Sequence, residues 1–335
     1  MKYSDYLSSW LREIGFTHFF YVGGGNIMHL TESLSNYLTG IPVIHEVASV
    51  IAAEYFNESA PNEQKALALV TAGPGLTNTV TGIAGAWLEN RFVLVVGGQV
   101  KTSDLKGESS IRQRGIQEID GVTLVSSICK HSIRFTKPES KQKVYDLINN
   151  CNSGKKGPLF IELPLDVQAT TNSDEFNHHD IQEWKSECPG IVEEDLNTLL
   201  LSWHNAKKPI LLIGGGVGRE RIAEINNLIY NKNIPVCTTY NGADRIDGNY
   251  PYYFGRPNTW GQRSANIIIQ KSDLIIALGT RLGLQQTGFN WQEFGRDAKI
   301  IQVDIDKYEL EKGHPRVYKG ICADANPLLI EFLKR

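Results

Sequence analysis

Short apolar runs alternate with amphipathic stretches along both halves of the chain. In the first half, we predict strands at residues 18–22, 43–45, 66–71, 92–97 and 159–162. In the second half, we predict strands in the ILLI run after Pro209 and at 234–239, 274–278 and 299–303, with helices at 219–231 and 327–334. Unbroken apolar runs are typical of parallel strands that are buried on both faces. The pattern therefore predicts an α/β fold with two doubly wound parallel-sheet domains, the second of them Rossmann-like.

A polar segment separates the two series of strands. Residues 169–189 are rich in charged and amide side chains and carry no strand pattern. We predict one domain at 1–168, a linker at 169–189 and a second domain at 190–335. A chain of 335 residues is long enough for two α/β domains.

Composition narrows the class of protein. The chain has 34 Lys and Arg against 37 Asp and Glu, a balance that argues against a nucleic-acid partner held through its phosphates. We find no apolar run near the roughly 18 residues that a membrane span needs, and no apolar signal-peptide core. The five cysteines form no CxxC pair, which favours free thiols in a reducing compartment. We expect a cytoplasmic protein with no membrane partner.

Glu46 lies where the apolar run 41–44 passes into an apolar helical stretch. We interpret this as a buried strand that leads into a helix with a carboxylate on its first turn. Apolar neighbours raise the pKa of a carboxyl group unless a hydrogen-bonding partner is supplied, and such an acid can move protons. A negative charge on a first turn also simply stabilises the helix dipole. The spacing alone does not separate these two interpretations.

Glycine clusters follow several predicted strands. Neither Gly23–Gly25 nor Gly214–Gly216 completes a GxGxxG motif with an acidic residue about 20 positions later. Tight turns explain the first cluster better. The second cluster, with the loop at Gly279 and Arg281, is equally compatible with a turn and with a site for dinucleotide phosphates.

The segment 71–78, TAGPGLTN, is a sharper signal. A predicted strand ends there in Gly73-Pro74-Gly75, and Thr77 and Asn78 open an apolar helix. Such a loop brings backbone groups and small side chains to the carboxyl edge of the sheet, where open α/β sheets bind ligands.

Taken together, motifs in a fixed order resemble a known family. The first half contains, in this order, His45-Glu46, TAGPGLTN (71–78), GGQV (97–100), GIQEID (115–120), CKHSIRF (129–135) and GPLFIELPLDVQ (157–168). Through these motifs it resembles the pyrimidine-binding domain of thiamine-diphosphate-dependent enzymes of the acetolactate synthase and pyruvate decarboxylase type. The second half resembles the central domain of the same enzymes through KKPILLIGGGVG (207–218), DLIIALGTRLG (273–283), IIQVDIDKYELEK (300–312) and GICADA (320–325).

The resemblance implies roles for individual residues. Glu46 would hydrogen-bond the aminopyrimidine ring of the cofactor and drive it to the tautomer that removes the thiazolium C2 proton. The residues that would bind thiamine diphosphate are Gly73, Pro74, Gly75, Thr77, Asn78 and Gln117, the last in the family's Gln-Glu pair with Glu118. In the acetolactate synthase branch the central domain carries FAD, which would fall near Gly214, Gly215, Gly279, Arg281, Asp304 and Asp306. His29 and His131 are weaker polar candidates.

The chain also departs from the family pattern. Ile116 stands where many relatives have Phe, and 23–26 is GGGN where relatives commonly have a Gly-x-Pro-Gly loop. The stretch 111–115 looks more like acetolactate-synthase homologues found with sugar and surface-polysaccharide genes.

The family holds the cofactor diphosphate through Mg²⁺ with a Gly-Asp-Gly motif, which this chain lacks. We therefore expect the chain to need a separate diphosphate-binding domain. With it, we expect decarboxylation and carboligation of a pyruvate-like 2-keto acid, in a homo-oligomer. The alternatives are a catalytically inert truncated homologue and an FAD-binding or regulatory module.

Overall fold

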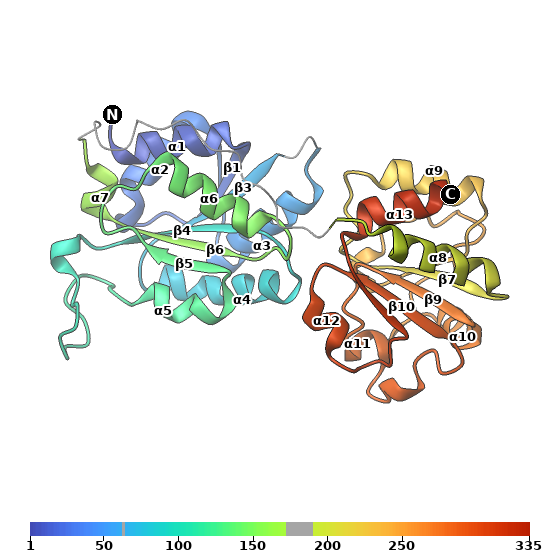
Figure 1. Cartoon of the computed structure of the whole chain (residues 1–335). Helices are drawn as coiled ribbons and strands as arrows, with labels where there is room; N and C mark the ends of the chain where they lie inside the picture. The colour runs from blue at the N-terminus through green and yellow to red at the C-terminus, as the bar shows by residue number, and fades with distance from the viewer. Residues whose placement is uncertain (62–63, 172–189) are drawn as a thin grey trace. The chain divides into compact units, whose positions relative to one another are not determined.

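The computed structural model describes residues 1–61, 64–171 and 190–335. The chain divides into two compact units, Met1–Ser186 and Glu187–Arg335 (Figure 1). This division falls inside the predicted linker 169–189, of which residues 172–189 lie outside the described part of the chain.

The N-terminal unit is built on a six-stranded parallel sheet with the order β2-β1-β3-β4-β6-β5. Its strands are β1 (Phe16–Tyr21), β2 (Thr39–Pro42), β3 (Lys65–Val70), β4 (Leu94–Gln99), β5 (His131–Arg134) and β6 (Leu159–Pro164). Its helices are α1 (Tyr3–Glu13), α2 (Met28–Tyr37), α3 (Glu46–Ser59), α4 (Pro74–Leu88), α5 (Gly121–Val125), α6 (Lys141–Asn152) and α7 (Leu165–Ala169). Side chains of α1, α2 and α6 pack on one face of the sheet, and those of α3 and α4 pack on the other.

The C-terminal unit carries a five-stranded parallel sheet with the order β11-β10-β9-β7-β8. The strands are β7 (Pro209–Ile213), β8 (Val236–Thr238), β9 (Leu274–Leu278), β10 (Lys299–Asp304) and β11 (Lys319–Cys322). The helices are α8 (Glu193–Asn205), α9 (Ile222–Asn231), α10 (Arg263–Lys271), α11 (Leu284–Thr287), α12 (Lys307–Glu311) and α13 (Ala325–Lys334). Helices α8, α9 and α13 cover one face and α10 covers the other. The predicted fold class, two parallel α/β sheets, is confirmed.

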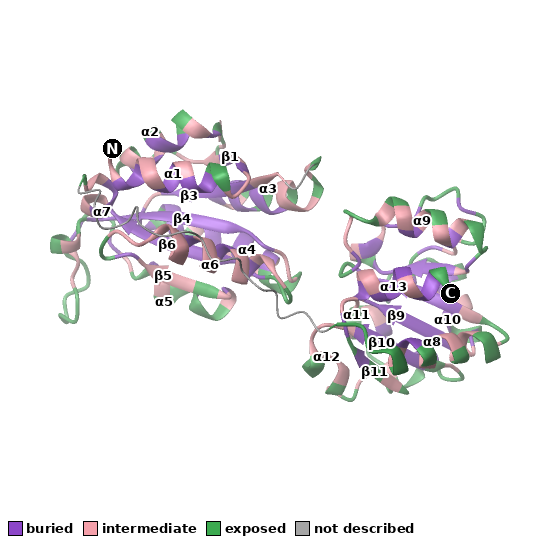
Figure 2. Ribbon diagram, turned by 45° about the horizontal axis from the view of Figure 1, so that its top comes forward, coloured by how far each residue is buried: buried purple, intermediate pink, exposed green. Residues whose placement is uncertain are grey.

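Burial explains why the central strands read as unbroken apolar runs. In β3, Leu67 and Leu69 face the core beside α1 and α2, whereas Ala68 and Val70 face the core beside α3 and α4. Every residue of β4 is buried. Figure 2 shows the inner strands of both sheets as buried, with exposed residues on the outer sides of the helices. Both faces of such strands must therefore be apolar.

Three of the four edge strands, β2, β5 and β11, were predicted poorly, whereas the edge strand β8 lies within the predicted 234–239. Strand β2 lies at Thr39–Pro42 rather than at 43–45, and most of its residues are exposed. The prediction of a buried strand leading into Glu46 was therefore wrong, and Ile44 beside it is fully exposed. Strands β5 and β11 are short and partly polar and lie at the sheet edges. No residue of β5 and only one residue of β11 is buried, so neither strand has an apolar run that could predict it.

Strand β2 has a further feature at its pairing with β1. Gly40 is the register partner of Phe19, and a Cβ atom on Gly40 would lie 2.6 Å from the Phe19 ring. The aromatic ring therefore lies across the space that a side chain at position 40 would fill. Pro42, which has no backbone N–H, ends the strand.

Both sheets contain a topological switch point. From β1 the chain reaches β2 on one side and β3 on the other, and from β7 it reaches β8 on one side and β9 on the other. In open α/β sheets, ligands bind outside the carboxyl ends of the strands at such a point. The glycine-rich loops at 23–25 and 214–216 follow β1 and β7, so each lies at a switch point.

Candidate functional site

Segments that are distant in sequence meet at the carboxyl edge of the N-terminal sheet. The loop after β1 contacts the end of β3, because the Asn26 amide donates to Thr71 Oγ1 at 3.3 Å. A Cβ atom on Gly24 would lie only 2.3 Å from Thr71 Cβ. The turn after β3 in turn contacts residue 117, which follows β4. These contacts make one continuous edge from β1 to β4.

Glu46 is the first residue of α3 and is only 9% exposed. Its Oε2 accepts a hydrogen bond of 2.9 Å from Asn78 Nδ2 on α4. In the described part of the chain, no group donates to the other oxygen, Oε1. A Cβ atom on Gly75 would lie 3.4 Å from that oxygen. The sequence required a hydrogen-bonding partner for a buried acid here, and Asn78 is that partner.

The turn 73–75 needs each of its residue types. Gly73 has φ +66° and ψ −123°, a backbone conformation that only glycine adopts readily. Pro74 opens α4, where its missing N–H costs nothing. A Cβ atom on Gly75 would lie 2.8 Å from Thr71 Cγ2. Thr77 is exposed, and its hydroxyl donates to the Pro74 carbonyl oxygen at 3.1 Å.

Gln117 lies on the other side of this turn. It is exposed and adopts a left-handed backbone with φ +61°, which is uncommon for a residue with a side chain. A Cβ atom on Gly73 would lie 2.6 Å from the Gln117 carbonyl oxygen and 2.9 Å from Gln117 Cβ. The structure thus brings Glu46, the turn 73–75, Asn78 and Gln117 to one edge of one unit.

The two weaker histidine candidates differ in position. His131 begins β5, at the amino edge of the sheet, and its Nε2 lies 2.9 Å from Asn150 Oδ1. Its place at the opposite edge removes it from the site. His29 lies in the first turn of α2, after the loop that follows β1.

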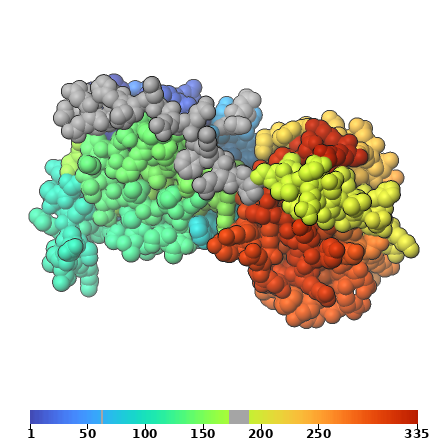
Figure 3. All heavy atoms as spheres, viewed as in Figure 1, coloured from blue at the N-terminus to red at the C-terminus, as the bar shows by residue number. Residues whose placement is uncertain are grey.

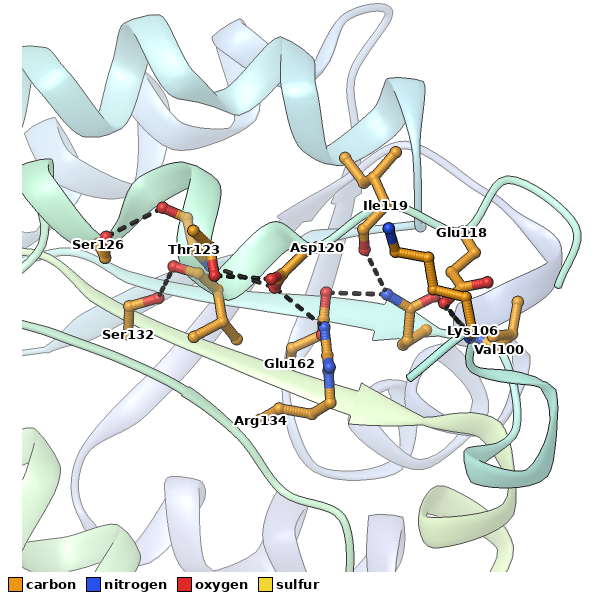
Figure 4. Close-up of polar contacts among 12 residues, drawn as sticks. Val100, Lys106, Glu118, Ile119, Asp120, Thr123, Ser126, Ser132, Arg134 and Glu162 are labelled. Carbon is orange, nitrogen blue, oxygen red and sulfur yellow. Dashed lines mark hydrogen bonds and ion pairs between the residues drawn. The ribbon is translucent and has the colours of Figure 1, made fainter. Parts of the chain in front are cut away.

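A buried polar network beside the site was missed from the sequence. Glu162 on β6 is 1% exposed and pairs with Arg134 Nε, while Gln99 Nε2 donates to Glu162 Oε1 at 3.1 Å (Figure 4). Burial raises the pKa of the Glu162 carboxyl above its ordinary value, and the Arg134 guanidinium offsets only part of this effect. Arg134 also reaches Asp120 at 3.3 Å, and Gln99 Nε2 donates to the Ile119 carbonyl oxygen at 2.9 Å. The sequence signal for this network was the presence of Gln99 and Glu162 within otherwise apolar strands.

The two triple-glycine loops differ in their hydrogen bonding. In the described part of the chain, the amides of Gly23, Gly24 and Gly25 donate no hydrogen bond. A Cβ atom on Gly23 or on Gly25 would meet nothing within 4 Å. The sequence favoured a plain tight turn here, yet this loop leaves its backbone amides open.

The loop at 214–216 is closed against its neighbour. The Gly214 amide donates to the Leu278 carbonyl oxygen at 2.8 Å, and the Gly216 amide donates to that of Gly279 at 2.9 Å. A Cβ atom on Gly214 would lie 2.2 Å from the Gly279 carbonyl oxygen. These glycines therefore serve close backbone packing between the loops after β7 and β9.

Further along the same loop, the Gly218 amide donates to Asn326 Oδ1 at 2.7 Å. The amides of 214, 216 and 218 are therefore occupied within the unit, and binding of FAD at this loop stays a prediction. Gly215 lies beside Asn241, and Arg281 is exposed. These central-domain residues belong to the other compact unit, Glu187–Arg335.

The described residues contain neither a cluster of metal ligands nor a helix that could span a membrane. Among residues 1–61, 64–171 and 190–335, no cluster of three or more His, Cys, Asp or Glu side chains could hold a metal ion. No helix in the same ranges combines the length and apolarity that crossing a membrane requires. Cys129, Cys151, Cys237 and Cys322 are free thiols, whereas Cys188 lies outside the described residues.

Comparison with protein families identifies the class. The N-terminal TPP binding domain of the thiamine pyrophosphate enzymes matches residues 1–124, and the central domain of the same enzymes matches residues 197–332. The chain belongs to the thiamine pyrophosphate enzyme family, of which it contains the N-terminal and central domains.

Individual relatives are large subunits of acetolactate synthases. The chain is 30% identical over 330 residues to a probable acetolactate synthase large subunit of Methanocaldococcus jannaschii, covering 94% of this chain and 52% of that protein. It is 28% identical over 330 residues to the acetolactate synthase isozyme 2 large subunit of Escherichia coli, covering 95% and 56%. It is 30% identical over 310 residues to the acetolactate synthase large subunit of Lactococcus lactis, covering 90% and 52%. The chain spans about half the length of the curated relatives it matches.

Proposed function

We propose that this chain supplies the cofactor-activating part of an acetolactate-synthase-like enzyme. The enzyme would decarboxylate a 2-keto acid such as pyruvate and pass the two-carbon unit to an acceptor. A further domain, in a longer polypeptide or in a second chain, would hold the cofactor diphosphate through Mg²⁺. The observation that carries this proposal is Glu46, a nine-tenths buried residue at the carboxyl edge of the sheet, whose Oε1 accepts no hydrogen bond from the residues that the structure describes.

The residues present fit the aminopyrimidine end of thiamine diphosphate. When bound, thiamine diphosphate supplies a thiazolium carbon that serves as nucleophile and electron sink. Glu46, the turn 73–75 and Gln117 would hold its pyrimidine ring. Asn78 fixes one oxygen of Glu46, so the other oxygen is oriented to exchange a proton with a ligand nitrogen. Because Gly75 has no side chain, that oxygen stays uncovered.

The environment of Glu46 supports this role. The carboxylate stands on the first turn of α3, a helix of 14 residues, where the helix dipole favours negative charge. The His45 side chain accepts from the Val47 amide at 3.3 Å and thereby caps the helix. Glu46 is therefore fixed at its backbone by the cap and at its side chain by Asn78.

Helix α3 carries an exposed apolar stripe. Ala48, Ile51 and Tyr55 recur at helical spacing on α3 and are all exposed, and the exposed Ile44 lies just before the helix. Exposed apolar patches of this kind are typical of protein–protein contact sites. The stripe runs along the helix that Glu46 opens, so a diphosphate-binding domain docked on it would lie next to the carboxylate. We propose this stripe as its docking surface, and the homo-oligomer stays a prediction.

The test is turnover of a 2-keto acid with thiamine diphosphate and Mg²⁺ by the chain assembled with its diphosphate-binding domain. Glu46→Gln keeps the shape of the side chain but removes its capacity to hold a proton. We expect a loss of at least about 100-fold in kcat, the usual range for general acid–base groups. Glu58→Gln on the same helix is the matched control and should leave kcat unchanged. Full activity in Glu46→Gln would remove Glu46 from the reaction and with it the proposal.

A further inference from the structure

The carboxylate of Glu118 joins both legs of a surface loop. Its Oε1 accepts from the Lys106 amide at 2.6 Å, and its Oε2 accepts from the amides of Arg114 and Gly115 at 3.0 and 3.1 Å. Lys106 lies on the outgoing leg, whereas Arg114 and Gly115 lie on the returning leg. Glu118 is only 7% exposed. One buried carboxylate thus closes the neck of the loop 106–115.

The loop has little else to hold its shape. Residues 107–114 are all exposed, and the segment projects from the body of the N-terminal unit (Figure 3). Its other hydrogen bonds are local. The Ser109 hydroxyl donates to the Lys106 carbonyl oxygen at 2.6 Å, and Gln113 Nε2 donates to the Gly115 carbonyl oxygen at 2.8 Å. Its adjoining ends are like those of an Ω-loop, a type of surface loop that frequently carries function. Without an apolar core, its position depends on the bonds at its neck.

The neck is continuous with the site. Gln117 directly precedes Glu118, and its left-handed backbone contacts Gly73. On the other side of Glu118, the carbonyl oxygen of Ile119 accepts from Gln99 Nε2 of β4 at 2.9 Å (Figure 4). Gln117 is therefore held between a fixed Glu118 and the turn 73–75 that faces Glu46.

We propose that Glu118 is a positioning residue that closes the loop 106–115 and holds Gln117 against Gly73 at the mouth of the thiamine site. This inference rests on the proposed function and assigns substrate selection to the loop and to Gln117. Glu118 itself contacts amides of the loop rather than the reacting atoms. Ile116, which is 82% exposed and adjacent to Gln117, would then contact the substrate.

The ionisation of Glu118 supports the same role. Burial alone would raise the pKa of the Glu118 carboxyl, but hydrogen bonds from the three backbone amides lower it below its ordinary value. The group is therefore charged at neutral pH, and hydrogen bonds to a charged acceptor are stronger than neutral ones.

The first experiment measures hydrogen exchange of the full chain. Glu118→Gln keeps the shape but places an amide NH₂ where one acceptor oxygen stood. We expect exchange at the amides of Lys106, Arg114 and Gly115 to rise at least 10-fold, with β3 and α4 unchanged. Glu108→Gln, an exposed residue of the same loop, should match the wild type. Wild-type exchange in Glu118→Gln would overturn the proposal.

The second experiment measures kinetics of the chain assembled with its diphosphate-binding domain. We expect Glu118→Gln to raise KM for the 2-keto acid about as much as Gln117→Ala does, without changing the affinity for thiamine diphosphate. The double variant should show no further rise, since both changes remove one interaction. Full additivity of the two effects would overturn the coupling between Glu118 and Gln117.

Failure of the proposed function is distinguishable from failure of this inference. If the proposed function is wrong, the wild type shows no thiamine-dependent turnover. If only the role of Glu118 is wrong, the wild type turns over and Glu118→Gln matches it in both exchange and KM.

Discussion

Replacing Gly73 with alanine should destabilise the N-terminal unit, because two separate costs fall on one Cβ atom. The first cost is conformational. Gly73 has φ +66° and ψ −123°, which an L-residue adopts only under strain. The second cost is steric, because the new Cβ would lie 2.6 Å from the carbonyl oxygen of Gln117 and 2.9 Å from its Cβ. Relief of this clash would require the turn or Gln117 to move.

The two costs set the expected magnitude. Backbone strain of this kind costs about 1–3 kcal/mol. Forcing a methyl group into a close-packed contact costs about 1–3 kcal/mol. Movement of Gln117 relieves part of the second cost, so we expect a loss of about 3 kcal/mol in the free energy of unfolding of the N-terminal unit.

Native-state hydrogen exchange of the full chain measures this loss, because the buried amides of β3 exchange through unfolding of their unit. A loss of about 3 kcal/mol corresponds to roughly 150-fold faster exchange in β3. The matched control is Gly85→Ala in the same helix, α4, where a Cβ atom would meet nothing within 4 Å. Alanine is a better helix former than glycine by about 0.5–1 kcal/mol, so Gly85→Ala should slow exchange at the β3 amides by a few fold.

Equal exchange in Gly73→Ala and the wild type would refute the reasoning about the turn. A destabilisation by Gly85→Ala as large as that by Gly73→Ala would show instead that any added methyl group harms α4.

Three other predictions follow from the polar contacts. Arg134→Met should destabilise the N-terminal unit by about 3 kcal/mol at pH 7, because it removes the cation that pairs with the buried Glu162 carboxylate. Burial raises the pKa of Glu162, so this carboxyl is protonated near pH 4, and denaturant unfolding should show a smaller loss there. Asn78→Ala should lower thiamine-dependent kcat through loss of its bond to Glu46, while the free energy of unfolding changes by only about 1 kcal/mol; unchanged kcat would contradict this. The pKa of Glu118 is lower in the folded chain than its unfolded value of about 4.3. Its ionised carboxylate therefore stabilises the fold fully above that value, and the stabilisation is lost as pH falls through the folded pKa. The difference in unfolding free energy between wild type and Glu118→Gln should thus shrink below pH 4, and a constant difference would contradict this reasoning.

The inner strands could be predicted from the sequence because burial on both faces demands unbroken apolar runs. Strand β9 lies at 274–278, as the pattern predicted. The edge strands β5 and β11 could not be predicted, because at most one residue of each is buried and neither forms an apolar run, whereas the edge strand β8 is buried and was predicted. The position of β2 was wrong for the same reason, since the apolar residues at 43 and 44 belong to the connection that follows it.

The candidate site divides in the same way. The places of Glu46 at the start of a helix and of the turn 73–75 between a strand and a helix could be predicted from the pattern, whereas their binding roles stay predictions. The hydrogen bonds of Glu118 could not, because backbone amides have no sequence signature. The triple-glycine loops show this limit most clearly. The backbone amides of Gly214 and Gly216 donate hydrogen bonds within their own unit, whereas those of Gly23–Gly25 donate none to the described residues. Both loops nevertheless have the same sequence, Gly-Gly-Gly.

The form of strand β2 bears on how the protein avoids unwanted association. An edge strand offers unpaired backbone groups that can template pairing with another chain. Here that edge is four residues long, lacks a side chain at Gly40 and lacks an amide at Pro42. The Phe19 ring packs across the gap, so the strand keeps its place in the sheet without needing an outer partner. The form of this edge therefore disfavours the pairing of one copy of the chain with another, strand against strand.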